Sequence, residues 1–150
     1  QSNYTITDFD SSSNLRLYNK ILCDDLISLG CIPRKSLKLK FPKYKIKYFS
    51  HFVRGFFDGD GSIHFNKPNT IKISFIGTEN FLKGLQLQLN KYLNIKINKR
   101  RIHHKMQIAE YYSNDARKLC RWIYKDCSRL YLSRKKERFD NHIKLRMENG

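Results

Sequence analysis

The sequence predicts an α+β fold in which helices cover one face of an antiparallel sheet. Four short segments alternate apolar and polar residues, as strands with one buried face do, and each pair is joined by a short turn. Four other stretches carry apolar residues every three or four positions, which indicates amphipathic helices. In chain order these segments are a helix around 52–58, strands at 62–66 and 71–75, a helix over 79–93, strands at 95–98 and 105–108, and helices over 115–125 and 131–147.

The chain is expected to divide into residues 1–45 and residues 46–150. The first part contains a short alternating segment and then a run of capping residues at 11–14. A helix over Leu15–Leu29 is expected to follow and to stop at Gly30. A basic connector then leads to the second part.

The stretch from Phe52 to Ile63 reads FVRGFFDGDGSI, and the second part of the chain is arranged around it. Gly55 and Gly59 lie four residues apart, on one side of the expected helix. A glycine inside a helix costs about 1 kcal/mol relative to alanine. Close approach of another helix is the usual reason for two of them on one side. We therefore expect this side to pack against a second helix.

The same helix ends in two carboxylates, Asp58 and Asp60, each followed by a glycine. Carboxylates at a helix C-terminus oppose the macrodipole by about 0.3–1 kcal/mol each, whereas a divalent cation would be attracted there. A plain helix–turn–strand connection is the alternative, because Asp-Gly is a common turn dipeptide. A calcium loop is excluded, since its glycine position would hold Ile63 and its last acidic position Asn69.

The second strand pair is expected to complete the sheet, and the helices after it are expected to complete the helical layer on one face of that sheet. A basic turn is expected near 99–101, and Ser113 or Asn114 is expected to cap the helix over 115–125. In this pair the residues expected to face the helices are Ile95, Ile97, Met106 and Ile108, and those expected to face outward are Lys96, Asn98, Lys105 and Gln107.

The composition favours a polyanionic partner. Lysine and arginine total 30 against 13 acidic residues, so the formal net charge is +17. No apolar run approaches the about 20 residues of a membrane span, and the basic residues are spread along the chain, which favours nucleic acid over a lipid surface. The four cysteines fit no zinc spacing, and we interpret them as reduced, mostly buried thiols of a cytoplasmic protein.

The stretch Val53–Gly61 resembles the nine-residue signature helix of the LAGLIDADG homing endonucleases. It keeps both glycines, the terminal acid Asp60 and the glycine after it, and departs at Arg54, where the family usually has a small residue. Arg54 is therefore expected to face away from the helix–helix contact. The expected element order after residue 45 also agrees with the half-domain of this family, αββαββα, which implies a saddle-shaped antiparallel sheet backed by helices.

The beginning of the chain repeats part of its end. Strand, capping residues, helix and an Arg-Lys pair follow one another both before residue 46 and from Lys105 onward, with Arg34 and Arg134 separated by 134 − 34 = 100 positions. Chance is the alternative in so basic a chain. The repeat makes residues 1–45 look like the tail of a preceding half-domain. Because family members work as pairs of half-domains, the resemblance implies a homodimer or a missing N-terminal half, joined through Gly55, Gly59, Phe52 and Phe56.

The resemblance implies a magnesium-dependent endonuclease that cleaves double-stranded DNA at specific sites. Asp60 and the carbonyl of Gly59 would hold Mg²⁺, and Lys135 would lie near the reactive water. Glu79 would touch the water network, although a favourable acid in the first turn of a helix explains it equally well. DNA contacts would come from outward sheet residues: Ser62, His64, Asn66, Lys72, Ser74, Lys96, Asn98, Arg100, Lys105 and Gln107.

Two other functions remain open at this point. A protein of this fold can bind nucleic acid without cleaving it, as a transcription regulator or an intron maturase, and it can also be an inert remnant of a mobile element. Retention of Asp60 favours the enzyme. Neither a small-molecule substrate nor a membrane is expected as a partner.

Overall fold

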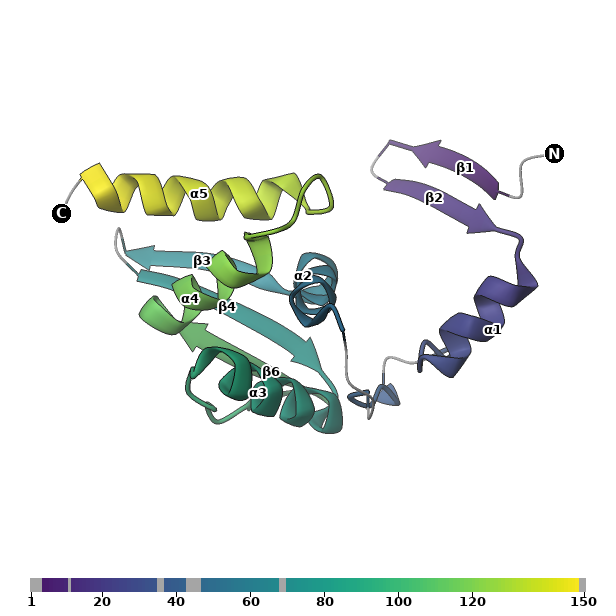
Figure 1. Cartoon of the computed structure of the whole chain (residues 1–150), viewed down its shortest axis with the longest axis horizontal. Helices are drawn as coiled ribbons and strands as arrows, with labels where there is room; N and C mark the ends of the chain where they lie inside the picture. The colour runs from purple at the N-terminus through teal and green to yellow at the C-terminus, as the bar shows by residue number, and fades with distance from the viewer. Residues whose placement is uncertain (1–3, 11, 35–36, 43–46, 68–69, 149–150) are drawn as a thin grey trace. The chain divides into compact units, whose positions relative to one another are not determined.

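The computed structural model describes residues 4–10, 12–34, 37–42, 47–67 and 70–148, without the side chains of Asn66 and Lys67 (Figure 1). The chain forms two compact units, Gln1–Lys35 and Ser36–Gly150. This boundary lies ten residues before the one expected from the sequence. The connector explains the difference, because Thr78 donates a hydrogen bond to the carbonyl of Leu39 at 2.5 Å and the Phe41 ring occupies the space beside Gly84.

The first unit consists of a hairpin, β1 (Tyr4–Phe9) and β2 (Ser12–Leu17), followed by α1 (Lys20–Ser28). The expected helix over Leu15–Leu29 is wrong in its first part. Residues 12–17 pair with β1 in antiparallel register, and the helix starts only after Asn19, whose Oδ1 accepts from the Leu22 N–H at 3.0 Å. None of the described residues of this unit is buried.

The second unit is built on an antiparallel four-stranded sheet with the strand order β3-β4-β6-β5. Its strands are β3 (Ser62–Lys67), β4 (Thr70–Gly77), β5 (Arg101–His103) and β6 (Met106–Tyr112). Its helices are α2 (Phe49–Asp60), α3 (Glu79–Leu93), α4 (Ser113–Tyr124) and α5 (Ser133–Glu148). The α+β class, the antiparallel sheet and the order of these elements agree with the prediction.

Burial alternates along β4, so the sheet has one covered face. Ile71, Ile73 and Phe75 are completely buried under α2, α3 and α4, whereas Lys72 and Ser74 point to the opposite side. We call that opposite side the outer face. Its neighbour β3 follows the same pattern, with Ile63 buried and Ser62 and His64 on the outer face.

The second strand pair differs from the prediction in position and in facing. Residues 95–98 form no strand, and β5 begins only at Arg101, so the turn lies at 104–105. In β6 the covered side holds Ala109 and Tyr111, which pair with Phe75 and Ile73 of β4. Met106 and Ile108 therefore lie on the outer face and Gln107 on the covered one, the reverse of what we expected. Both sets in β6 contain apolar residues, so pairing with β4 decides which set is buried.

The helix α2 is held by a cluster of aromatic rings. Phe49, Val53 and Phe57 are buried at helical spacing, and the Phe56 ring lies 4.6 Å from that of Phe81. Arg54 is also buried, on the side away from the glycines, and its guanidinium donates to the carbonyls of Leu130 at 2.7 Å and Ile123 at 3.0 Å. Arg54 therefore lies off the exposed glycine side, which is the side expected to form the helix–helix contact.

The helix α4 starts two residues earlier than expected, at Ser113. Tyr112 occupies the N-cap position and provides no side-chain hydrogen bond there, so neither predicted capping residue has that role. Of the four free cysteines, Cys120 and Cys127 are buried, whereas Cys23 and Cys31 are exposed, so the expectation that they are mostly buried is wrong for half of them. In the described part of the chain, no helix has both the length and the apolar character needed to cross a membrane.

Candidate functional site

The end of α2 places its two carboxylates in different environments. Asp58 is half-buried, and its carboxylate accepts from the Tyr124 hydroxyl at 2.9 Å and from the Leu132 N–H at 3.0 Å. Asp60 is exposed, and among the described residues its carboxylate has no hydrogen-bond or ion-pair partner. Asp58 is therefore engaged by two segments distant in sequence, and Asp60 is the carboxylate that remains accessible for chemistry.

Lys135 lies beneath this helix end. It is 3% exposed, and its ammonium group donates to three carbonyls: those of Phe57 at 2.6 Å, Asp58 at 2.9 Å and Gly61 at 2.5 Å. Burial and the neighbouring Arg134 lower the pKa of Lys135, while Asp58 and Asp60 act to raise it. The Lys135 cation therefore offsets part of the negative potential at the helix end, the same potential that is expected to attract a divalent cation.

The glycine side of α2 is open. Gly55 and Gly59 are both exposed, and a methyl group built on either glycine would meet no atom of the described residues of this unit within 4 Å. Phe52 and Phe56, the other two residues expected at a helix–helix interface, are half-buried and pack on aromatic rings of their own unit. The exposed part of the expected interface is therefore the backbone at the two glycines, and the two rings are already packed within the unit.

Glu79 lies at the same end of the sheet as Asp60, because β3 starts where the antiparallel β4 finishes. Its side chain is 69% exposed and forms a 3.9 Å ion pair with Arg100. Arg100 also donates to Gln107 at 2.6 Å and to the buried Gln86 at 2.7 Å. Arg100 and Gln107, both expected to contact DNA, are thus engaged with each other at the covered side.

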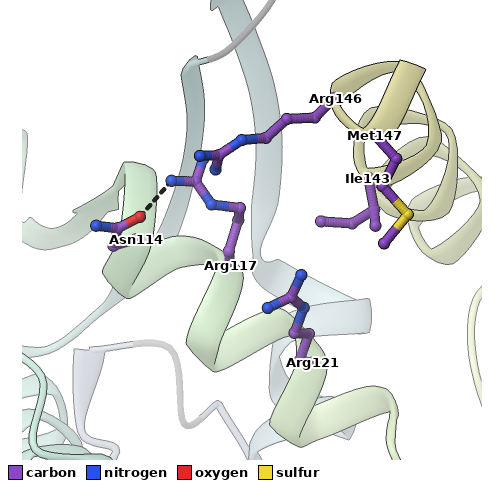
Figure 2. A pocket seen from close by; sticks show the side chains of 6 residues that line it. All are labelled: Asn114, Arg117, Arg121, Ile143, Arg146 and Met147. Carbon is purple, nitrogen blue, oxygen red and sulfur yellow. Dashed lines mark hydrogen bonds between the residues drawn. The ribbon is translucent and has the colours of Figure 1, made fainter. Parts of the chain in front are cut away.

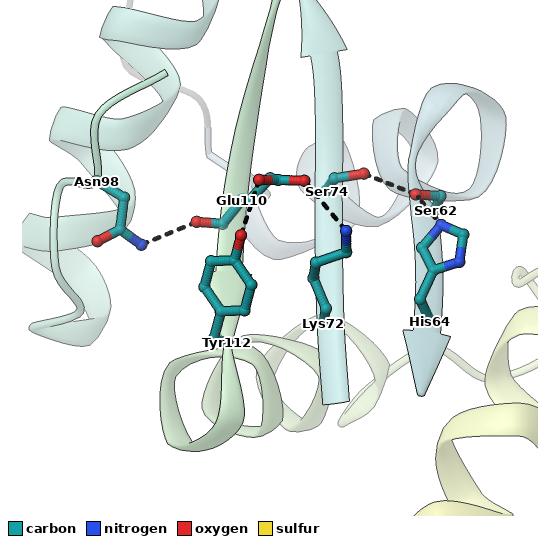
Figure 3. A network of polar contacts seen from close by, with 7 residues as sticks. All are labelled: Ser62, His64, Lys72, Ser74, Asn98, Glu110 and Tyr112. Atoms are coloured by element: carbon teal, nitrogen blue, oxygen red, sulfur yellow. Dashed lines mark hydrogen bonds and ion pairs between the residues drawn. The ribbon is translucent and has the colours of Figure 1, made fainter. Parts of the chain in front are cut away.

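The outer face carries a row of connected polar side chains across β3, β4 and β6 (Figure 3). The Ser62 and Ser74 hydroxyls lie 2.6 Å apart, and the His64 ring lies 3.1 Å from Ser62. In the same row, Lys72 contacts Glu110 at 3.3 Å. Four of the expected DNA-contacting residues, Ser62, His64, Lys72 and Ser74, are therefore brought together on one surface.

Glu110 holds one end of this row and was not expected there. Burial acts to raise the pKa of Glu110, but hydrogen bonds from Tyr112 and Lys72 outweigh it and hold the pKa below its ordinary value. Arg101 and His103 of β5 also lie on the outer face, opposite Ile108 and Met106. Glu110 was missed because the facing of β6 was assigned one position out of phase, and Arg101 and His103 were missed because the partner strand was expected at 95–98.

The remaining expected contacts are more dispersed. Lys105 lies in the β5–β6 turn, and Lys96 lies in the irregular segment before β5, where its N–H donates to Asp115 at 3.1 Å. The Asn98 amide donates to the Glu110 carbonyl at 2.8 Å, at the edge of the sheet. The side chain of Asn66 lies outside the described residues.

One copy of the chain offers few ligands for a metal ion. No group of three or more histidine, cysteine, aspartate or glutamate side chains within the described ranges could hold one. Mg²⁺ is usually bound by one or two carboxylates together with water and substrate oxygens. The exposed Asp60 and the backbone of Gly59, in the last turn whose carbonyls lack helical donors, fit part of such a site.

Comparison of the chain with protein-family models, with curated proteins and with solved structures finds no match. The geometry of the site and the resemblance of Val53–Gly61 are therefore the grounds for assigning a function.

Proposed function

We propose that this chain is one half of a LAGLIDADG-type endonuclease, which cleaves double-stranded DNA when a second half-domain completes it. The observation that carries the proposal is the asymmetry at the end of α2. The Asp58 carboxylate accepts hydrogen bonds from Tyr124 and Leu132. Asp60, in contrast, is exposed to solvent beside the exposed glycines of α2. The element order from α2 to α4, αββαββα, is that of the half-domain to which the signature belongs.

Each residue at the helix end has a separate role in this proposal. Asp58 ties the helix end to Leu132 and Tyr124, and Lys135 satisfies the carbonyls below it, so both position Asp60. Asp60 and its counterpart from the second half-domain would hold Mg²⁺, with the Gly59 carbonyl beside them. When bound, such ions activate water and neutralise charge on a phosphodiester.

The outer face would bind the DNA. A ribbon of antiparallel strands fits the major groove, where hydroxyl, imidazole and ammonium groups reach base edges. Ser62, His64, Lys72 and Ser74 supply these groups from neighbouring strands. Other lysines and arginines would contact phosphates and set the register of the protein on the duplex.

Cleavage by the assembled protein tests the proposal. We expect Asp60→Asn to abolish magnesium-dependent cutting of a randomised duplex library while DNA binding persists, because the amide keeps the shape but not the charge. Asp126→Asn is the matched control, since it changes the charge of another exposed aspartate, after α4. Sedimentation should first establish the protein concentration at which the chain self-associates, or the missing half should be added. Equal cutting by the Asp60→Asn and parent proteins would show that Asp60 is not the metal ligand.

A binding module without cleavage is the second candidate. It is favoured by Lys135, because all three of its protons are already donated to carbonyls and are not directed at a substrate. Failure of the assembled parent protein to cut any duplex, together with binding to an intron RNA, would favour this alternative.

A further inference from the structure

A cavity between α4 and α5 has no role in the proposed endonuclease. Figure 2 shows that Asn114, Arg117 and Arg121 reach it from α4, and that Ile143, Arg146 and Met147 reach it from α5. Its volume is about 370 Å³. Because α4 packs on the covered side of the sheet, this cavity does not belong to the outer face.

Three guanidinium groups converge on this cavity, and none of the six lining residues is acidic. Arg117 is 7% exposed and donates to the side-chain oxygen of Asn114. Burial lowers the pKa of Arg117, and the charges of Arg146 and Arg121 lower it further, so the three cations lie close enough to repel one another. Neither Arg121 nor Arg146 forms an ion pair with a described carboxylate.

A buried histidine also lies beside the cavity, and it does not neutralise the charge of the arginines. His142 is 4% exposed, its ring stacks on Phe65 at 5.0 Å, and its Nε2 has no hydrogen-bond partner among the described residues. Burial, followed by the charges of Arg117 and Arg146, lowers the pKa of His142, so the ring is neutral at pH 7. The fold therefore gathers positive charge here without a compensating anion among the lining residues.

We propose that this cavity binds the phosphate groups of a nucleotide, either free or within a nucleic-acid strand. Guanidinium groups match phosphate oxygens with pairs of N–H donors, and they do so better than ammonium groups. Ile143 and Met147 provide an apolar wall for the sugar or base. The cavity volume lies within the range of small-molecule sites, about 300–1,000 Å³. The site does not include Asp60 or the outer face, so it goes beyond the proposed endonuclease and does not depend on it.

The test compares two double variants of the full chain. Arg121→Gln with Arg146→Gln removes the two exposed guanidiniums and leaves the buried Arg117 in place. Lys118→Gln with Lys144→Gln is the matched control, because it takes the same charge from exposed positions of the same two helices that do not line the cavity. The probes are inorganic phosphate, adenosine monophosphate and a 5′-phosphorylated thymidine trinucleotide. Binding of each probe is measured by calorimetry and by NMR of the arginine Nε–Hε groups.

We expect the parent protein to bind the monophosphate or the trinucleotide and to shift the Nε–Hε signals of Arg117, Arg121 and Arg146 together. The affinity of the arginine double variant for these nucleotides should be at least about tenfold lower, which corresponds to the loss of one charge-assisted hydrogen bond. The affinity of the lysine control should stay within about twofold of that of the parent. Binding of inorganic phosphate alone, equal weakening in both double variants, or shifts at other arginines would each contradict the proposal. If the arginine variant does not fold, the shifts in the parent protein still decide. Asp60→Asn should bind the nucleotides like the parent, which separates this test from that of the endonuclease.

Discussion

Asp58 and Asp60 have the same side chain and lie within one helical turn, yet their surroundings differ. Residues two positions apart on an α-helix point about 200° away from each other. Asp58 therefore faces Tyr124 and the start of α5, whereas Asp60 faces solvent. A negative helix end with two carboxylates is kept stable by Lys135, which contacts three backbone carbonyls from below.

Replacing Lys135 tests this structural role. We expect Lys135→Met to lower the free energy of unfolding by about 2–4 kcal/mol, because three carbonyls at the helix end lose a charged donor. Urea denaturation followed by circular dichroism measures the change. Lys136→Met is the control, since its 2.6 Å ion pair with Asp140 lies at the surface and should contribute no more than about 1 kcal/mol. Similar stability of the two variants would show that Lys135 does not stabilise the helix end that carries Asp60.

Glu110 offers a second test at the residue scale. Its pKa is held below the ordinary value, so it is ionised at neutral pH and neutralises Lys72 on the outer face. We expect Glu110→Gln to tighten binding to duplex DNA and to increase the salt dependence by about one phosphate contact, as Lys72 becomes free. Fluorescence anisotropy between low and moderate salt measures both effects. Glu137 is an exposed glutamate of α5, and Glu137→Gln should change neither the affinity nor its salt dependence. Unchanged binding in Glu110→Gln would show that DNA does not contact this row of side chains.

At the scale of the element, α2 has two sides with opposite requirements. One side buries Val53 and Phe57 under the sheet and holds Arg54 by hydrogen bonds. The other side presents the backbone at Gly55 and Gly59, which no described residue of the same unit covers. Within its own unit the chain gains nothing from glycine at these two positions, and our proposal of a closely approaching second half-domain would explain their presence.

Alanine at the two glycines separates stability from assembly. We expect Gly55→Ala and Gly59→Ala each to raise the stability of the monomer by about 0.5–1 kcal/mol, because alanine is the better helix former and its methyl group meets no atom. The same changes should weaken self-association, which sedimentation across micromolar concentrations measures. Gly84→Ala in α3 is the contrast and should destabilise the protein, because its methyl group would overlap the Phe41 ring. Unchanged self-association in both α2 variants would exclude the glycine side as the contact.

At the scale of the whole molecule, the net charge of +17 is the dominant property. So large a charge destabilises a compact chain by self-repulsion, and a polyanion relieves that repulsion. The charge is not confined to one surface, because the outer face carries Lys72, Arg101 and the histidines while three arginines meet between α4 and α5.

The affinity for duplex DNA should therefore depend steeply on salt. Contact with at least about six phosphates gives a slope of log affinity against log salt near −5, because each neutralised phosphate contributes about −0.9. Anisotropy with a long duplex from 50 to 200 mM salt measures it, and vesicles containing phosphatidylserine serve as the comparison. An affinity that does not change with salt, or preferential binding to the vesicles, would contradict a nucleic-acid partner.

The sequence by itself determined the class of the second unit, the order of its elements and the helix with its two glycines and terminal acid. These features depend on local periodicity and on the spacing of glycine and aspartate, which are properties of the sequence that do not require tertiary contacts. The same information placed Ser62, His64, Lys72 and Ser74 on one face, because alternation in β3 and β4 is clear.

Only the tertiary structure decided what depends on contacts between distant segments. Apolar residues occupy both sides of β6, so its facing followed from the pairing of Ala109 and Tyr111 with β4. The start of the first helix followed from strand pairing with β1, which competes with the capping signal of the serines. Lys135 was found under the carbonyls of α2, and the three arginines were found around one cavity, because long side chains from separate helices meet only after the core has packed.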